Sequence, residues 1–134
     1  MQKQILSVIS RCCIVFSGVL LLNFGTVSAH TPAGMNFGLD YKRKIVSFTI
    51  GHAVMDPEKH YIKSIEIKIG SRVAVKQAFV RQTDEDSMYA CYCLADARET
   101  ERITIKAFCN ESGSITKSFR LWDLQGKSQA LDVP

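Results

Sequence analysis

The segment that decides the fold is residues 61–69, which read Tyr-Ile-Lys-Ser-Ile-Glu-Ile-Lys-Ile. Isoleucine alternates with a polar residue over most of this segment. A strand turns successive side chains to opposite faces of its sheet, whereas a helix repeats its apolar positions at a period near 3.6. The segment therefore predicts a β-strand with one buried face.

The same pattern recurs on both sides of this strand. Six further segments are rich in β-branched and aromatic residues and are separated by turn signals. They cover residues 35–41, 45–50, 73–80, 88–94, 102–108 and 115–121. No segment of useful length has a helical period. The sequence therefore predicts an all-β protein, an immunoglobulin-like β-sandwich of about seven strands.

Length and composition fit one small folded domain. The chain has 134 residues, of which 46% are hydrophobic, and this excludes both a large multi-domain enzyme and a disordered chain. Its 17 basic residues exceed its 13 acidic residues by a formal charge of +4. These charges interleave, and no run of four basic residues occurs. We therefore expect no nucleic-acid partner.

The N-terminus has the features of a secretory signal peptide over residues 1–29. Lys3 and Arg11 precede a short apolar run, and the small residues Val27 and Ala29 stand before the expected cleavage site. The run is shorter than the ~20 apolar residues of a permanent membrane span, although an uncleaved anchor is the alternative. We expect cleavage after Ala29, a periplasmic or secreted protein without a stable membrane span, a folded domain over 30–123 and a loose tail over 124–134.

Cleavage would leave three cysteines, which is an awkward number in an oxidising compartment. Cys12 and Cys13 belong to the signal peptide, and Cys91, Cys93 and Cys109 remain. Cys91 and Cys93 lie two apart on one predicted strand, so their side chains share a face, which disfavours a bond between them. Cys109 pairs with one of them in a disulfide, packs as a small buried hydrophobe, or binds a metal.

All histidines of the chain stand beside turns. They are His30 at the expected mature N-terminus and His52 and His60 at the two ends of one loop, while Cys109 ends a predicted strand. Imidazole and thiolate ligands suit iron, zinc or copper rather than magnesium or calcium. We therefore treat His30, His52, His60 and Cys109 as candidate metal ligands, against the alternative that the histidines are ordinary surface residues.

Three short motifs give the chain a resemblance to the iron-binding domain of desulfoferrodoxin and the superoxide reductases, also called neelaredoxins. The motifs are His30-Thr31-Pro32, His52…His60-Tyr61-Ile62 and Cys109-Asn110-Glu111-Ser112-Gly113, and the resemblance spans residues 30–121. In that family a mononuclear non-haem iron has four equatorial histidines and an axial cysteinate. The resemblance implies that ferrous iron reduces superoxide to hydrogen peroxide with electrons from a donor protein.

The chain also departs from the family pattern. Ser112 stands where the family has its fourth equatorial histidine, Ala53 replaces a proline, and the loop from His52 to His60 is about two residues longer. The glutamate and lysine that precede the first histidine in the family are absent. Lys59, beside His60, is the nearest positive charge in sequence and is a candidate for steering an anion, or else an ordinary solvated lysine.

The departure at Ser112 suggests a compensating ligand. Cleavage after Ala29 would give His30 a free α-amine, which a metal deprotonates readily because the ordinary pKa of such an amine is ~7.7–8.0. Chelation by this amine and the imidazole would favour copper.

Two other functions compete with a superoxide reductase. One is a non-catalytic periplasmic protein that binds or delivers iron, copper or zinc through the same residues. The other is a metal-free module that binds a protein partner or carries sulfur on a cysteine.

Overall fold

Seven strands and one short helix make up the part of the chain that the computed structural model describes, residues 31–125. The elements are β1 (Gly34–Asp40), β2 (Ile45–Gly51), β3 (Ile62–Ile69), β4 (Arg72–Ala78), β5 (Ser87–Cys93), β6 (Arg102–Cys109), β7 (Ser114–Arg120) and α2 (Leu121–Leu124). Every strand lies within two residues of its predicted bounds. The short helix α2 was not predicted, because four residues are too few to display a helical period.

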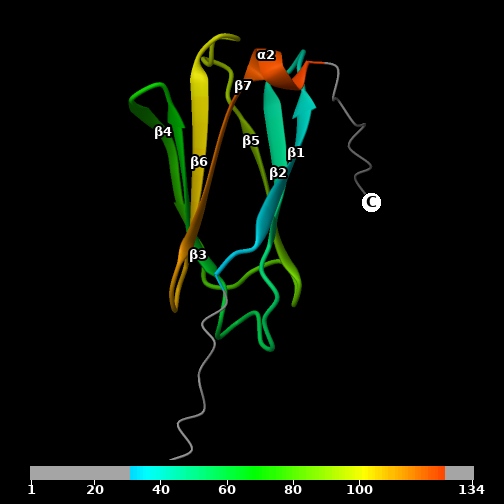
Figure 1. Ribbon diagram of the computed structural model, residues 1–134, viewed down its shortest axis with the longest axis vertical. Helices are drawn as coiled ribbons and strands as arrows, with labels where there is room; N and C mark the ends of the chain where they lie inside the picture. Colours follow the sequence, from blue (N-terminus) through cyan, green and yellow to red (C-terminus); the bar gives the residue numbers. More distant parts are fainter. Residues whose placement is uncertain (1–30, 126–134) are drawn as a thin grey trace, which may run out of the picture.

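The strands form two antiparallel sheets that face each other (Figure 1). One sheet has the order β1-β2-β5 and the other the order β4-β3-β6-β7. The prediction of an all-β sandwich with seven strands is confirmed. In the constant-type immunoglobulin arrangement the fourth strand joins the first, second and fifth, whereas here β4 pairs with β3.

The core lies between the sheets and follows the alternation of the sequence. On β3, Ile65, Ile67 and Ile69 are buried as the pattern predicts. Ile62 is buried as well, because the register shifts between Ile62 and Ser64 in the pairing of β3 with β6. Such a bulge re-aims the side chains beside it. Here it sets Ile62 opposite Cys109, the last residue of β6.

The two ends of the sandwich differ. The short helix α2 covers one end, and the chain enters the described part at the other end, beside the loop between β2 and β3 and the turn between β6 and β7 (Figure 1). Leu124 of α2 packs against the core, and residues 126–134 of the predicted tail lie outside the described residues. Within residues 31–125 no helix has the length and apolar character needed to cross a membrane. The predicted signal peptide and the candidate ligand His30 lie outside the described residues.

Candidate metal centre

Three of the four residues predicted as ligands meet at one end of the sandwich. His52 directly follows β2, His60 precedes β3, and Cys109 ends β6. One nitrogen of each imidazole and the sulfur of Cys109 all lie within 4.8 Å of one another. Cys109 is 3% exposed and His52 is 1% exposed. The strands of both sheets therefore bring together two imidazoles and a thiol that lie far apart in the sequence.

The loop of residues 52–60 is fixed by hydrogen bonds at both ends. His52 N–H donates to the carbonyl of Asp86 (2.8 Å), and Val54 N–H donates to the carbonyl of Glu85 (2.7 Å). At the other end the carbonyl of Asp56 accepts the N–H groups of Lys59 (3.1 Å) and His60 (2.9 Å). The loop that presents both histidines is thus anchored to the segment before β5 at one end and closed by its own backbone at the other.

Asn110 fixes His60 against Cys109. Its side-chain oxygen accepts the N–H of Tyr61 (2.9 Å), and its side-chain nitrogen donates to the carbonyl of Lys59 (2.7 Å). Its own N–H donates to the carbonyl of Tyr61 (3.0 Å). Asn110 therefore binds the residues on both sides of His60, and His60 Nε2 lies 3.0 Å from the sulfur of Cys109.

The sulfur of Cys109 lies in the turn that follows β6. The backbone N–H of Glu111 donates to this sulfur (3.4 Å), and the N–H of Cys109 donates to the carbonyl of Gly113 (3.1 Å). The thiolate is the form of cysteine that binds metals. The carboxylate of Glu111 lies 3.7 Å from His60 Nδ1, so one turn supplies groups to both His60 and Cys109. Ser112, in the same turn, is exposed.

Gln82, which the sequence did not single out, determines the proton position on His52. Its side-chain nitrogen donates to the carbonyls of His52 and Asp84, both at 2.8 Å. These two bonds fix the amide orientation, so its oxygen must accept the bond from His52 Nδ1 at 2.7 Å. His52 therefore carries its proton on Nδ1 and its lone pair on Nε2. Gln82 is 1% exposed.

The two imidazole rings are set at different angles. Their centroids lie 4.7 Å apart and their planes are nearly perpendicular, at 89°. Histidine ligands commonly donate the second ring N–H to a carboxylate or carbonyl, which orients the ring toward the metal. Here Gln82 accepts from His52, and Glu111 lies beside His60. The donor set and these outer partners fit a transition-metal ion such as iron, zinc or copper.

The first described residues lie against this end of the sandwich. The N–H of Ala33 donates to the carbonyl of Gly51 (2.8 Å), and Pro32 is buried. The side chain of Thr31 lies over Gly113, since a Cβ placed on Gly113 would stand 2.9 Å from both Cγ2 and Oγ1 of Thr31. His30, the residue before Thr31, lies outside the described residues.

Lys59 is not one of the groups that converge on the site. Its amine pairs with the carboxylate of Asp56 at 2.8 Å, and its side chain is 84% exposed. The hydrogen bond that Lys59 donates to Asp56 raises the pKa of Lys59 most, and the negative charge of that carboxylate raises it further. The lysine therefore stays charged at neutral pH, and a negative partner offsets part of that charge locally.

Cys91, Cys93 and Cys109 are all free thiols in this structure. Cys109 is buried at the site, whereas Cys91 and Cys93 are exposed on β5. The disulfide considered for Cys109 is therefore not formed.

Replacing Gly113 with alanine should disturb both the turn and Thr31. Gly113 has φ +82°, which costs a residue with a Cβ about 1–2 kcal/mol, and the new Cβ would collide with Thr31. Gly70→Ala is the matched control, because Gly70 has φ +60° with nothing within 4 Å of the added atom. Urea unfolding should give a larger loss of stability for Gly113→Ala than for Gly70→Ala. Equal losses would show that the Thr31 contact is unimportant.

Replacing Gln82 with leucine should release the ring of His52. We expect a loss of about 1–3 kcal/mol in unfolding free energy from the unpaired buried groups, and a metal affinity lower by about 10–100-fold. Gln82→Glu keeps an acceptor for His52 Nδ1 and should recover part of the affinity, and Gln125→Leu, exposed after α2, is the control. The ¹⁵N shifts of the His52 ring report its tautomer. An unchanged tautomer and affinity in Gln82→Leu would contradict the assigned role.

Comparisons with known proteins add little to this geometry. No family model matches the chain, and no curated protein matches it significantly. A solved structure titled superoxide reductase (neelaredoxin), from Ignicoccus hospitalis, is similar over 71% of this chain and 85% of its own, with 11% sequence identity and a TM-score of 0.40. At that level of similarity, function must be argued from the side chains of this chain.

Proposed function

We propose that this protein binds one iron ion and reduces superoxide to hydrogen peroxide. The observation that carries the proposal is the convergence of His52, His60 and Cys109, whose ligand atoms lie within 4.8 Å of one another. The resemblance of the sequence motifs to superoxide reductases supports iron over the other metals that suit this donor set. The substrate would be superoxide, and a separate protein would supply the electron.

The surroundings of the ligands support metal binding over a chance cluster. A buried polar group costs free energy unless it has partners, so two buried ligands must be stabilised. Gln82 stabilises His52 in the tautomer with its lone pair on Nε2, and the N–H of Glu111 stabilises the sulfur of Cys109. Both candidate ligands are thus held in place by neighbouring groups of the fold.

The iron would supply the one-electron chemistry. Superoxide takes up one electron and two protons to become hydrogen peroxide. Cys109 would contribute a negative thiolate, which donates electron density to a metal, as cysteinate does in haem enzymes. Asn110 would keep His60 beside that sulfur, and Gln82 would keep the ring of His52 oriented. Lys59 would attract the superoxide anion, and its pairing with Asp56 would weaken this attraction.

His30 is the fourth ligand in this proposal. Thr31, which follows His30 in the sequence, lies over Gly113 in the turn after Cys109. Cleavage after Ala29 would add the α-amine of His30 as a further nitrogen, in place of the histidine that Ser112 replaces. This part of the proposal requires that the protein is exported to the periplasm or secreted, because the signal peptide is cleaved during export.

A non-catalytic metal-binding or metal-delivery protein is the second candidate. Two observations favour it: Ser112 is exposed and offers no imidazole, and Lys59 is paired with Asp56. Copper or zinc would suit the same residues.

The first test is metal analysis of the anaerobically purified protein, followed by a superoxide consumption assay. We expect about one iron per chain and, after oxidation, a visible charge-transfer band from the thiolate. Cys109→Ser should remove the band and the activity. His52→Ala and His60→Ala should each lower metal affinity by more than about tenfold. Cys93→Ser, exposed on β5, is the matched control for the cysteine change.

These outcomes separate the candidates. A protein that holds metal but does not consume superoxide would support the non-catalytic metal-binding or metal-delivery function. A protein that takes up no iron, copper or zinc would contradict both.

A second test addresses the α-amine of His30. One alanine added between Ala29 and His30, in a form processed at the same cleavage site, would convert the amine into an amide. We expect weaker binding of copper above all, measured by competition with a chelator. The control is His30→Ala, which removes the imidazole and keeps a terminal amine. Unchanged affinity and stoichiometry in the extended form would exclude the amine as a ligand.

A further inference from the structure

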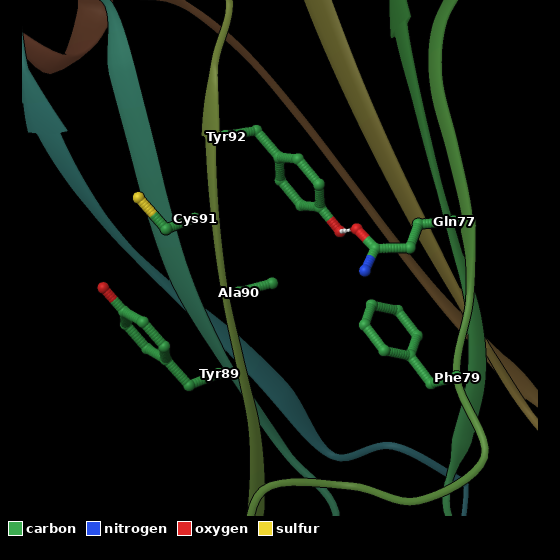
Figure 2. Close-up of a pocket in the computed structure, with 6 residues that line it drawn as sticks. All are labelled: Gln77, Phe79, Tyr89, Ala90, Cys91 and Tyr92. Carbon is green, nitrogen blue, oxygen red and sulfur yellow. Dashed lines mark hydrogen bonds between the residues drawn. The ribbon is translucent and has the colours of Figure 1, made fainter.

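Two thiols outside the candidate metal centre share one face of β5. Cys91 and Cys93 are both free and exposed. Figure 2 shows Cys91 and Tyr89 on the side of β5 away from Gln77, whereas Tyr92 points toward Gln77. Cys93 follows Cys91 by two positions, so the alternation of a strand sets it on the same face as Cys91. Both sulfurs are therefore open to a ligand from one side of the sheet.

The backbone that carries the two cysteines is held in place. β5 pairs with β2 over all seven of its residues, without a shift of register. Between the two cysteines, the hydroxyl of Tyr92 donates to Gln77 Oε1 on β4 at 2.8 Å. Just beyond Cys93, the N–H of Leu94 donates to the carbonyl of Lys44 (2.9 Å). The sheet therefore sets the spacing of the two thiols.

This spacing is too wide for a disulfide and suits a metal ion between the sulfurs. Strand residues rise about 3.4 Å each, so the Cβ atoms of Cys91 and Cys93 are about 6.8 Å apart, whereas a disulfide needs about 3.5–4.5 Å. Two metal–thiolate bonds of about 2.3 Å set two sulfurs about 4.6 Å apart across a linear complex. The two side chains reach that separation by leaning toward each other, which the common χ1 rotamers of strand residues allow.

We propose that Cys91 and Cys93 bind one soft monovalent metal ion, Cu⁺, between their two thiolates. Thiolates select soft ions such as Cu⁺, which is satisfied by two of them, whereas structural Zn²⁺ takes four ligands. The residues opposite Cys91 and Cys93 on β2 are Ser47 and Ile45, which offer neither a carboxylate nor an imidazole. The pair of thiols is therefore a two-ligand site.

This site is separate from the candidate metal centre. Ile45, opposite Cys93, is the first residue of β2, whereas His52 directly follows the last residue of that strand. Cys93 and His52 therefore lie toward opposite ends of the three-stranded sheet. The two sites share no ligand.

Positive charge lies beside the proposed ligands. Binding of one Cu⁺ releases the two thiol protons, so the complex of one cation and two thiolates carries a charge of −1. The sulfur of Cys93 donates to the carbonyl of Arg43 at 3.5 Å, in a turn that contains three consecutive basic residues, Lys42, Arg43 and Lys44. Asp40 pairs with Arg43 alone. This turn offsets the charge of the complex, and the weak bond of a thiol to a carbonyl is readily replaced by a metal bond.

The experiment uses the full chain with Cys12 and Cys13 replaced by serine, and the probe is Cu⁺ transferred anaerobically from a coloured chelator complex. Cys91→Ser and Cys93→Ser should each remove the same one equivalent of bound Cu⁺, and the double variant should lose no more. The affinity for that equivalent should fall at least about a hundredfold, because the second thiolate binds intramolecularly. Tyr89→Ser, on the same face, is the matched control and should bind as much Cu⁺ as the parent. Thermal unfolding checks that each variant is folded.

Sedimentation with and without Cu⁺ checks that both ligands come from one chain. Equal Cu⁺ uptake in all variants, a loss in only one of the two single variants, or a larger loss in the double variant would overturn the proposal. A dimer that forms only with Cu⁺ and requires Cys91 or Cys93 would overturn it as well. Metal held by His52, His60 and Cys109 cancels in the difference between variants, so the result is independent of the proposed function.

Discussion

The pairing of β3 with β6 is the constraint on which the candidate centre depends. This register sets Ile62 opposite Cys109, and the bonds of Asn110 to Lys59 and Tyr61 continue the contact beyond the end of the ladder. The backbone on both sides of His60 is therefore held beside Cys109, and His60 Nε2 lies 3.0 Å from its sulfur. A slip of one residue would turn the buried isoleucines of β3 outward, so the burial of the core also maintains the geometry of the site.

Two neutral amides, Gln82 and Asn110, support the candidate ligands. Each amide both donates and accepts, so one side chain can bind a carbonyl and a donor group at the same time. A carboxylate in the place of Gln82 could accept from His52 but could not donate to the carbonyls of His52 and Asp84. The amides thus satisfy buried backbone groups and orient the ligands without adding charge to the buried surroundings of His52 and Cys109.

The sequence alone predicted most of the fold and the main members of the site. Strict alternation identified the strands, because burial on one face of a sheet produces a period of two. The bulge at Ile62 and Ser64 was not predicted, since an extra residue interrupts that period without a signal of its own. The convergence of His52, His60 and Cys109 followed from motifs at the ends of strands. Gln82 was missed because its role arises from contacts with loop carbonyls brought together by the fold. The pairing of Lys59 with Asp56 is a local contact that the sequence pattern did not single out.

The separation of the three ligand-bearing segments along the chain couples metal occupancy to the folding equilibrium. His60 and Cys109 are 49 positions apart, so an unfolded chain does not present them together. A metal ion held at this site would therefore bind the native state more tightly than the denatured chain. By mass action, free metal at about a thousand times its dissociation constant would add about 4.1 kcal/mol to the unfolding free energy. The resistance of this small sandwich to denaturation would then depend on the metal supply of its compartment.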